Sequence, residues 1–89
     1  MKSHLTRDFR VCFASLPERI QRLARENYRL WQHNPHHPGL DFKRVGRKCP
    51  AYSVRIGIGW RALGFRQRDT IVWFWIGSHA GYERLIKRL

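Results

Sequence analysis

The sequence predicts an α+β domain, in which an N-terminal helical hairpin packs on a twisted, mainly antiparallel sheet of three to four strands and a short C-terminal helix follows. Apolar residues recur at helical spacing in the first third of the chain, whereas apolar and polar residues alternate from Tyr52 onward. With 89 residues, the chain makes one small domain, 1–89. Its five Phe, four Trp and three Tyr supply much of the buried area.

The first helix is expected to begin at Thr6, whose hydroxyl suits the N-cap position, with Asp8 in the first turn. Phe9, Phe13 and Leu16 then fall on one helical face. Residues 9–13 also alternate between apolar and polar types, so their spacing alone leaves a strand open.

A second helix is expected from Pro17 to about Gln32. Ser15 and Glu18 have the spacing of a capping box, and Pro35 ends the helix because the residue before proline leaves the α region. The predicted core stripe is Ile20, Leu23, Ala24, Leu30 and Trp31. Another face carries Arg19, Arg22, Arg25 and Arg29. We expect this face to be solvated, or to contact nucleic acid or an acidic partner.

The remaining chain predicts strands. Residues 42–45 suit a short strand or an extended segment, and 52–56 form a strand with Tyr52, Val54 and Ile56 on one face and Ser53 and Arg55 on the other. A glycine turn at 57–59 leads into a strand over 60–66. After a turn at 67–69, the strand 71–77 is apolar on both faces, which is typical of a central strand. Ser78 then caps a helix over 80–87.

The chain is strongly basic. Its 18 Lys and Arg against 6 Asp and Glu give a net charge of +12 and a pI of about 11.3, which favours a polyanionic partner over a merely soluble basic surface. Membrane binding is not expected, because no long basic amphipathic helix, signal peptide or spanning apolar run is present. Cys12 and Cys49 form no CxxC pattern. We expect both to be reduced thiols of a cytoplasmic protein.

No metal or other cofactor is expected, because Pro35 and Pro38 break the helical spacing of the nearby histidines. Arg55, Arg61, His79 and Tyr82 lie on or just past adjacent predicted strands. A positive, proton-donating cluster of this kind suits chemistry on a phosphate. For His79 the alternative is a structural cap of the last helix, and for Tyr82 it is packing in the core.

In order and spacing these segments resemble the RelE/ParE superfamily of toxins from bacterial type II toxin–antitoxin systems. The resemblance runs through Leu16-Pro-Glu-Arg-Ile-Gln, Asn34-Pro-His-His-Pro-Gly-Leu, Phe42-Lys-Arg-Val and the three C-terminal runs, and so covers nearly the whole chain. It implies a helix at residues 9–13. Family members usually open with a short strand, but only Met1 to His4 precede the helix here, so we expect that strand to be missing or vestigial.

The resemblance implies a toxin that cleaves mRNA without a metal, on the ribosome, and that is held by a cognate antitoxin, which sets the oligomeric state. Arg61 matches the family's strand arginine, although Trp60 replaces the usual Tyr; Arg55 matches a basic position, and His79 and Tyr82 match the C-terminal acid or base. RNA binding is expected from Lys43, Arg44, Arg66 and Trp60. The alternatives are a member that poisons DNA gyrase and a non-catalytic basic module that only holds an antitoxin or RNA.

Overall fold

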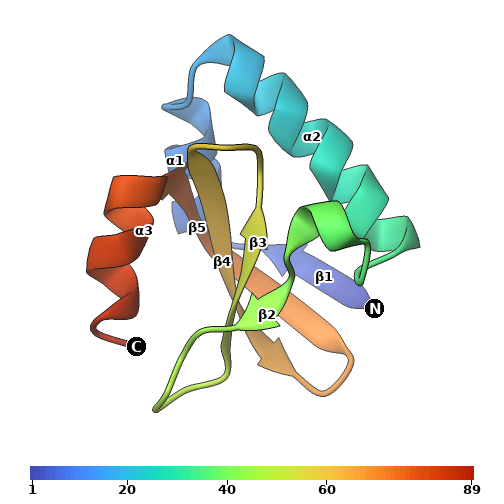
Figure 1. Ribbon diagram of the computed structural model, residues 1–89, viewed down its shortest axis with the longest axis vertical. Helices are drawn as coiled ribbons and strands as arrows, with labels where there is room; N and C mark the ends of the chain where they lie inside the picture. The colour runs from blue at the N-terminus through green and yellow to red at the C-terminus, as the bar shows by residue number, and fades with distance from the viewer.

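A five-stranded sheet separates two helical layers in the computed structural model, which describes all 89 residues (Figure 1). Helices α1 and α2 lie on one side of the sheet and α3 lies on the other. In chain order the elements are β1 (Lys2–Leu5), α1 (Arg7–Ala14), α2 (Glu18–His33), a 3-10 turn (Pro38–Leu40), β2 (Lys43–Arg44), β3 (Ala51–Arg55), β4 (Trp60–Gln67), β5 (Thr70–Ser78) and α3 (His79–Ile86). The predicted α+β class is therefore confirmed.

The first strand is present, so the expectation that it is missing or vestigial was wrong. The sheet order is β1-β5-β4-β3-β2, and β1 pairs with β5 in parallel, with Lys2 opposite Thr70 and Leu5 opposite Trp73. The four residues of β1 thus pair with the first four residues of β5. The sheet is thus mixed and has five strands instead of three or four, with β4 rather than β5 in the middle.

The helical hairpin begins at the predicted residue, but the turn between its two helices differs from the prediction. Thr6 caps α1, because its hydroxyl accepts a hydrogen bond from the backbone N–H of Phe9 at 3.1 Å. The predicted capping box was wrong: Ser15 ends α1, and its hydroxyl donates to the carbonyl of Val11 at 3.3 Å. Pro17 takes the N-cap position of α2 without a side-chain bond. Ser15 therefore lies at the C-cap of α1 and is not the N-cap of α2.

The main core lies between the helical hairpin and the sheet. Trp31 of α2 and Trp73 of β5 are almost fully buried and meet edge to face, with ring centroids 5.4 Å apart. The other buried members of this core are Leu16, Ile20, Ala24, Leu40, Val54, Ile56, Ala62, Ile71 and Ile76. In the predicted stripe of α2, Leu23 and Leu30 are only half-buried. This face of the sheet is called the hairpin face below, and the face under α3 is called the α3 face.

Two glycines allow the sheet to bring its strands together. Gly57 has φ of +121°, a conformation that favours glycine, and it forms the turn between β3 and β4. Gly64 lies at a register shift between β4 and β5, where a Cβ atom would come within 2.6 Å of Ile71 and 2.9 Å of Trp73. The predicted burial of β5 on both faces holds in part, because Trp73 is buried but Trp75, on the α3 face, is half-buried.

Candidate functional site

Two arginines stand side by side on the α3 face. Arg55 of β3 and Arg61 of β4 are direct partners in the antiparallel register, so both side chains leave the same face of the sheet. Arg55 is exposed and Arg61 is half-buried. Like charges directly opposite each other destabilise a sheet. This pair therefore makes a local positive site that an anion would stabilise.

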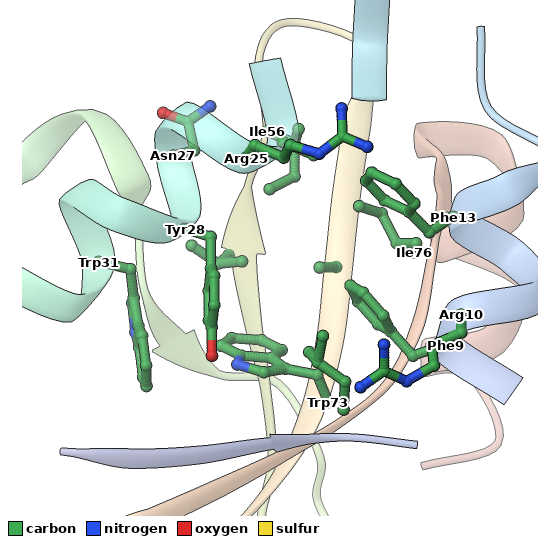
Figure 2. A pocket seen from close by; sticks show the side chains of 14 residues that line it. Phe9, Arg10, Phe13, Arg25, Asn27, Tyr28, Trp31, Ile56, Trp73 and Ile76 are labelled. Atoms are coloured by element: carbon green, nitrogen blue, oxygen red, sulfur yellow. The ribbon is translucent and has the colours of Figure 1, made fainter. Parts of the chain in front are cut away.

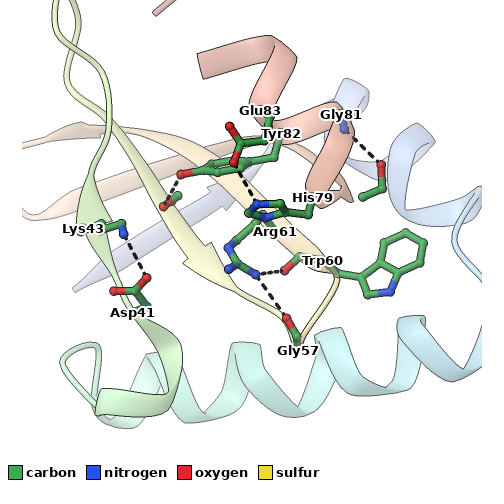
Figure 3. Close-up of polar contacts among 11 residues, drawn as sticks. Asp41, Lys43, Gly57, Trp60, Arg61, His79, Gly81, Tyr82 and Glu83 are labelled. Atoms are coloured by element: carbon green, nitrogen blue, oxygen red, sulfur yellow. Dashed lines mark hydrogen bonds and ion pairs between the residues drawn. The ribbon is translucent and has the colours of Figure 1, made fainter. Parts of the chain in front are cut away.

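The guanidinium of Arg61 is held by the turn beneath it. Its Nη1 donates to the carbonyl of Trp60 at 2.9 Å and to that of Gly57 at 3.2 Å (Figure 3). The same guanidinium lies over the ring of Tyr82, 6.0 Å from the centroid. Its Nε and Nη2 groups have no acceptor within the chain. Arg61 is thus oriented by the backbone and keeps donors free for a ligand.

The helix α3 places its first residue beside this pair. Ser78 caps α3 by accepting from the N–H of Gly81 at 3.2 Å, as predicted. His79 is the first residue of the helix rather than part of a loop, and its N–H donates to the carbonyl of Gly59 at 2.8 Å. The cap and the turn of the β3–β4 hairpin therefore fix the start of α3 at the edge of the arginine pair.

His79 has a carboxylate partner that the sequence reading missed. Its Nε2 lies 2.9 Å from an oxygen of Glu83, one helical turn later, and both side chains are about half exposed, at 45% and 53% (Figure 3). Nδ1 of His79 is shielded from solvent and has no partner. The spacing of the two residues, four apart, was the available signal once a helix was assumed there. A carboxylate at this distance can fix the orientation of the imidazole ring.

Tyr82 lies under the cluster rather than on its surface. The residue is 6% exposed, its ring centroid is 5.5 Å from that of His79, and its hydroxyl donates to Ser53 at 3.5 Å. Of its two predicted alternatives, packing is the arrangement observed. Its buried ring supports both Arg61 and His79 from below.

Lys43 of β2 also lies on the α3 face, because it is opposite Ser53 in the register. It is exposed and forms an ion pair with Asp41 at 3.1 Å. We call Lys43, Arg55, Arg61, His79, Tyr82 and Glu83 the basic cluster.

Three of the predicted RNA-binding residues, Arg44, Trp60 and Arg66, lie on the hairpin face and not beside the arginine pair. Arg66 lies over the ring of Tyr52, 5.3 Å from the centroid, and its Nε donates to the carbonyl of Arg68. Arg44 is opposite Tyr52 in the register, and Trp60 packs against the core. Each is an odd number of residues from a cluster member on its own strand, and strand alternation therefore sends it to the other face.

The structure contains no group of three His, Cys, Asp or Glu side chains arranged to hold a metal. Cys12 and Cys49 are free and half-buried. None of the helices has the length and apolar character needed to cross a bilayer. The basic cluster itself combines cationic side chains with one imidazole–carboxylate pair.

Comparison with known proteins places the chain in a family. The model of the ParE-like toxin domain matches residues 18–84, and the chain belongs to this family within the RelE/ParE toxin superfamily of type II toxin–antitoxin systems. A search of the curated proteins gives no match to the sequence.

Solved structures share the fold at low identity. The RelB–RelE antitoxin–toxin complex of Methanococcus jannaschii aligns with a TM-score of 0.73 at 16% identity, covering 92% of this chain and 96% of that one. The RelBE2 toxin–antitoxin complex of Mycobacterium tuberculosis aligns with a TM-score of 0.70 at 20% identity, over 88% and 96% of the two chains. The YoeB/ParE toxin of Agrobacterium tumefaciens gives 0.66 at 14% identity, over 89% and 99%.

Proposed function

We propose that this toxin stops growth by cutting mRNA endonucleolytically on the ribosome, without a metal ion. The observation that carries the proposal is the register pairing of Arg55 with Arg61, next to the His79–Glu83 pair. Fixed cations aimed at developing charge usually supply the largest share of catalysis. An imidazole beside them supplies the proton transfer that cleavage of a phosphodiester requires.

The reaction that suits these groups is attack by the ribose 2′-OH on the adjacent phosphorus. The bond from phosphorus to the 2′ oxygen forms, the bond to the 5′ oxygen breaks, and a proton passes from the first oxygen to the second. Arg55 and the free donors of Arg61 stabilise the negative phosphorane. His79, oriented by Glu83, takes or gives the proton, and Lys43 contacts a neighbouring phosphate.

We also propose that a cognate antitoxin silences the toxin and sets its oligomeric state. The toxin then acts in the cytoplasm, where it meets mRNA and ribosomes. Three of the similar solved structures are complexes of a toxin with its antitoxin. The net charge of +12 suits both RNA and an acidic protein. Induced expression should arrest growth, and co-expression of a neighbouring antitoxin gene should restore it.

The decisive experiment identifies the ends of the cleaved RNA. The toxin is dialysed against EDTA to remove bound metal and is then mixed with ribosome–mRNA complexes in their own magnesium buffer. Activity should be unchanged by the dialysis, and the products should carry a 2′,3′-cyclic phosphate and a 5′-OH. Products with a 5′-phosphate would contradict attack by the 2′-OH.

Poisoning of DNA gyrase is the second candidate, and the family description favours it, because the matching model is that of ParE-like toxins. Pulse labelling after induction separates the two candidates. Protein synthesis should fall before DNA synthesis if mRNA is the target. An earlier fall of DNA synthesis, with accumulation of gyrase–DNA adducts, would select gyrase instead.

A further inference from the structure

A second open surface lies on the α3 face, over the strands β1, β5 and β4. Ile71 and Trp73 belong to the hairpin core, so Thr70 and Val72, which alternate with them along β5, point to the α3 face. Residues opposite each other in register share a face. The α3 face therefore carries two rows of side chains here, namely Lys2–Thr70–Gln67 and His4–Val72–Phe65. The outer residues of both rows are exposed, and we call this surface, together with Arg68 and Phe74, the open patch.

An aromatic pair forms one end of the open patch. The register shift between β4 and β5 leaves Phe74 without a partner in β4. Its ring stacks on that of Phe65, with centroids 4.3 Å apart and planes 15° apart. Phe65 is 38% exposed, although it is a large hydrophobic residue. A ring that is held by a stacked neighbour and is accessible to solvent is a platform on which a nucleobase can stack.

Basic side chains lie at the other end. Lys2, His4 and Arg68 line a shallow depression there, and only one of its seven lining residues is hydrophobic. Asp69 is the only acid among them. Neither Lys2 nor Arg68 takes part in an ion pair of the chain. Two free cations beside an exposed aromatic pair are complementary to a strand of phosphates and bases.

The open patch is separate from the basic cluster, although both lie on the α3 face. Arg61 and Phe65 belong to the same strand, β4, and the rise per residue places them about 13 Å apart along it. Leu63 lies between them on the same face and is completely buried. A covered residue thus divides the two surfaces, and a nucleic acid in contact with Phe65 need not touch Arg61.

We propose that the open patch is a second binding site for single-stranded RNA, distinct from the site of cleavage. One base stacks on Phe65, and the phosphates next to it pair with Lys2 and Arg68. The inference goes beyond the proposed function, because binding at the patch requires no cleavage. A helix of a partner protein fits this place poorly, since the depression offers a single hydrophobic residue, Val72.

Fluorine NMR of protein labelled with para-fluorophenylalanine tests the proposal at the residues themselves. Of the five Phe of the chain, Phe65 and Phe74 report on the open patch. Phe9 and Phe13 line an apolar groove between the helical hairpin and the sheet (Figure 2), and Phe42 packs against the hairpin core, so these three are internal controls. The probe is a single-stranded 2′-O-methyl RNA of about ten nucleotides, which lacks the 2′-OH needed for cleavage.

The RNA should shift the signals of Phe65 and Phe74 and leave the other three unchanged. Phe65→Leu keeps an apolar side chain but loses the flat ring, and it should weaken binding, followed at Phe74, about tenfold. Phe13→Leu is the matched control on the hairpin face, and it should bind the RNA as the wild type does.

The salt dependence of binding tests the basic end of the patch. Arg68→Asn removes one phosphate contact and should reduce the slope of log affinity against log salt concentration by about 0.7. Asn is chosen because it tolerates the left-handed backbone of this residue, which has φ of +56°. Arg19→Asn, at an exposed position of α2, loses the same charge and should keep the wild-type slope.

No shift of Phe65, equal shifts of all the Phe signals, or equal effects of each variant and its control would overturn the proposal. Loss of the Phe65 shift in Arg61→Ala would also overturn it, by assigning the RNA contact to the basic cluster. An acidic peptide that shifts Phe65 and Phe74 while RNA does not would assign the patch to protein instead. No cleavage is measured, so an inactive protein that gives the Phe65 shift separates failure of the proposed function from failure of this inference.

Discussion

The two faces of the sheet differ in how completely helices cover them. On the hairpin face, α1 and α2 bury a continuous aromatic and aliphatic core and leave one apolar groove. On the α3 face, an eight-residue helix covers only part of the sheet, and Arg55 remains exposed beside Arg61. The short covering helix thus leaves Arg55 accessible and supplies His79, Tyr82 and Glu83 beside it. Incomplete cover leaves a polar site on one face and an apolar groove on the other.

The same strands serve both faces. Ala62 of β4 is buried in the hairpin core, while its neighbour Arg61 belongs to the basic cluster. In β3, Val54 and Arg55 are divided in the same way. Since successive residues of a strand point to opposite faces, a slip of one residue would exchange core and site. Substitutions at neighbouring positions should therefore have effects of different kinds.

The largest effect is expected at His79. His79→Ala should lower the rate of single-turnover cleavage of ribosome-bound mRNA by about 10²–10⁴-fold, because a proton-transfer group is lost. His79→Gln keeps a hydrogen bond to Glu83 but transfers no proton, and it should be equally slow. His33→Ala, at an exposed position at the end of α2, should keep the wild-type rate. Full activity of the Gln variant, with an unchanged thermal melt, would assign His79 to structure alone.

The next effect distinguishes the two faces directly. Arg61→Ala should cost about 10²–10³-fold in the same rate, because a fixed cation is removed from the developing charge. Arg66→Ala, on the same strand but on the hairpin face, should leave the rate near that of the wild type. Thermal melts of both proteins control for folding, since Arg61 also bonds to two backbone carbonyls. Equal losses in the two variants would contradict the division of the sheet into one catalytic and one structural face.

The smallest effect concerns stability. Gly64→Ala places a Cβ atom against Ile71 and Trp73 on the hairpin face and should lower the free energy of unfolding by about 1–3 kcal/mol. Gly59→Ala, in the turn beside the basic cluster, meets nothing within 4 Å and should raise it by about 0.4–1 kcal/mol. Urea denaturation measures both values. A Gly64 variant as stable as the wild type would show that the hairpin core adjusts more easily than its close packing indicates.

Much of the fold was predictable because its signals are local. The cap of α1 at Thr6, the glycine turn at 57–59 and the cap of α3 at Ser78 each depend on a few adjacent residues, and all three were confirmed. The capping box at Ser15 failed because the same residues also suited the end of the preceding helix. The strand at Lys2–Leu5 was missed because its partner lies far away in the sequence.

The sequence by itself determined the alternation of the strands, the strong positive charge and the presence of Arg55, Arg61 and His79 near one another along adjacent elements. Only the tertiary structure decided that Lys43 of β2 shares a face with them, and that Glu83 lies 2.9 Å from Nε2 of His79. The physical reason is that alternation fixes which residues share a face within one strand, whereas the register between strands depends on distant packing. The contact of Trp31 in α2 with Trp73 in β5 is an example of such distant packing.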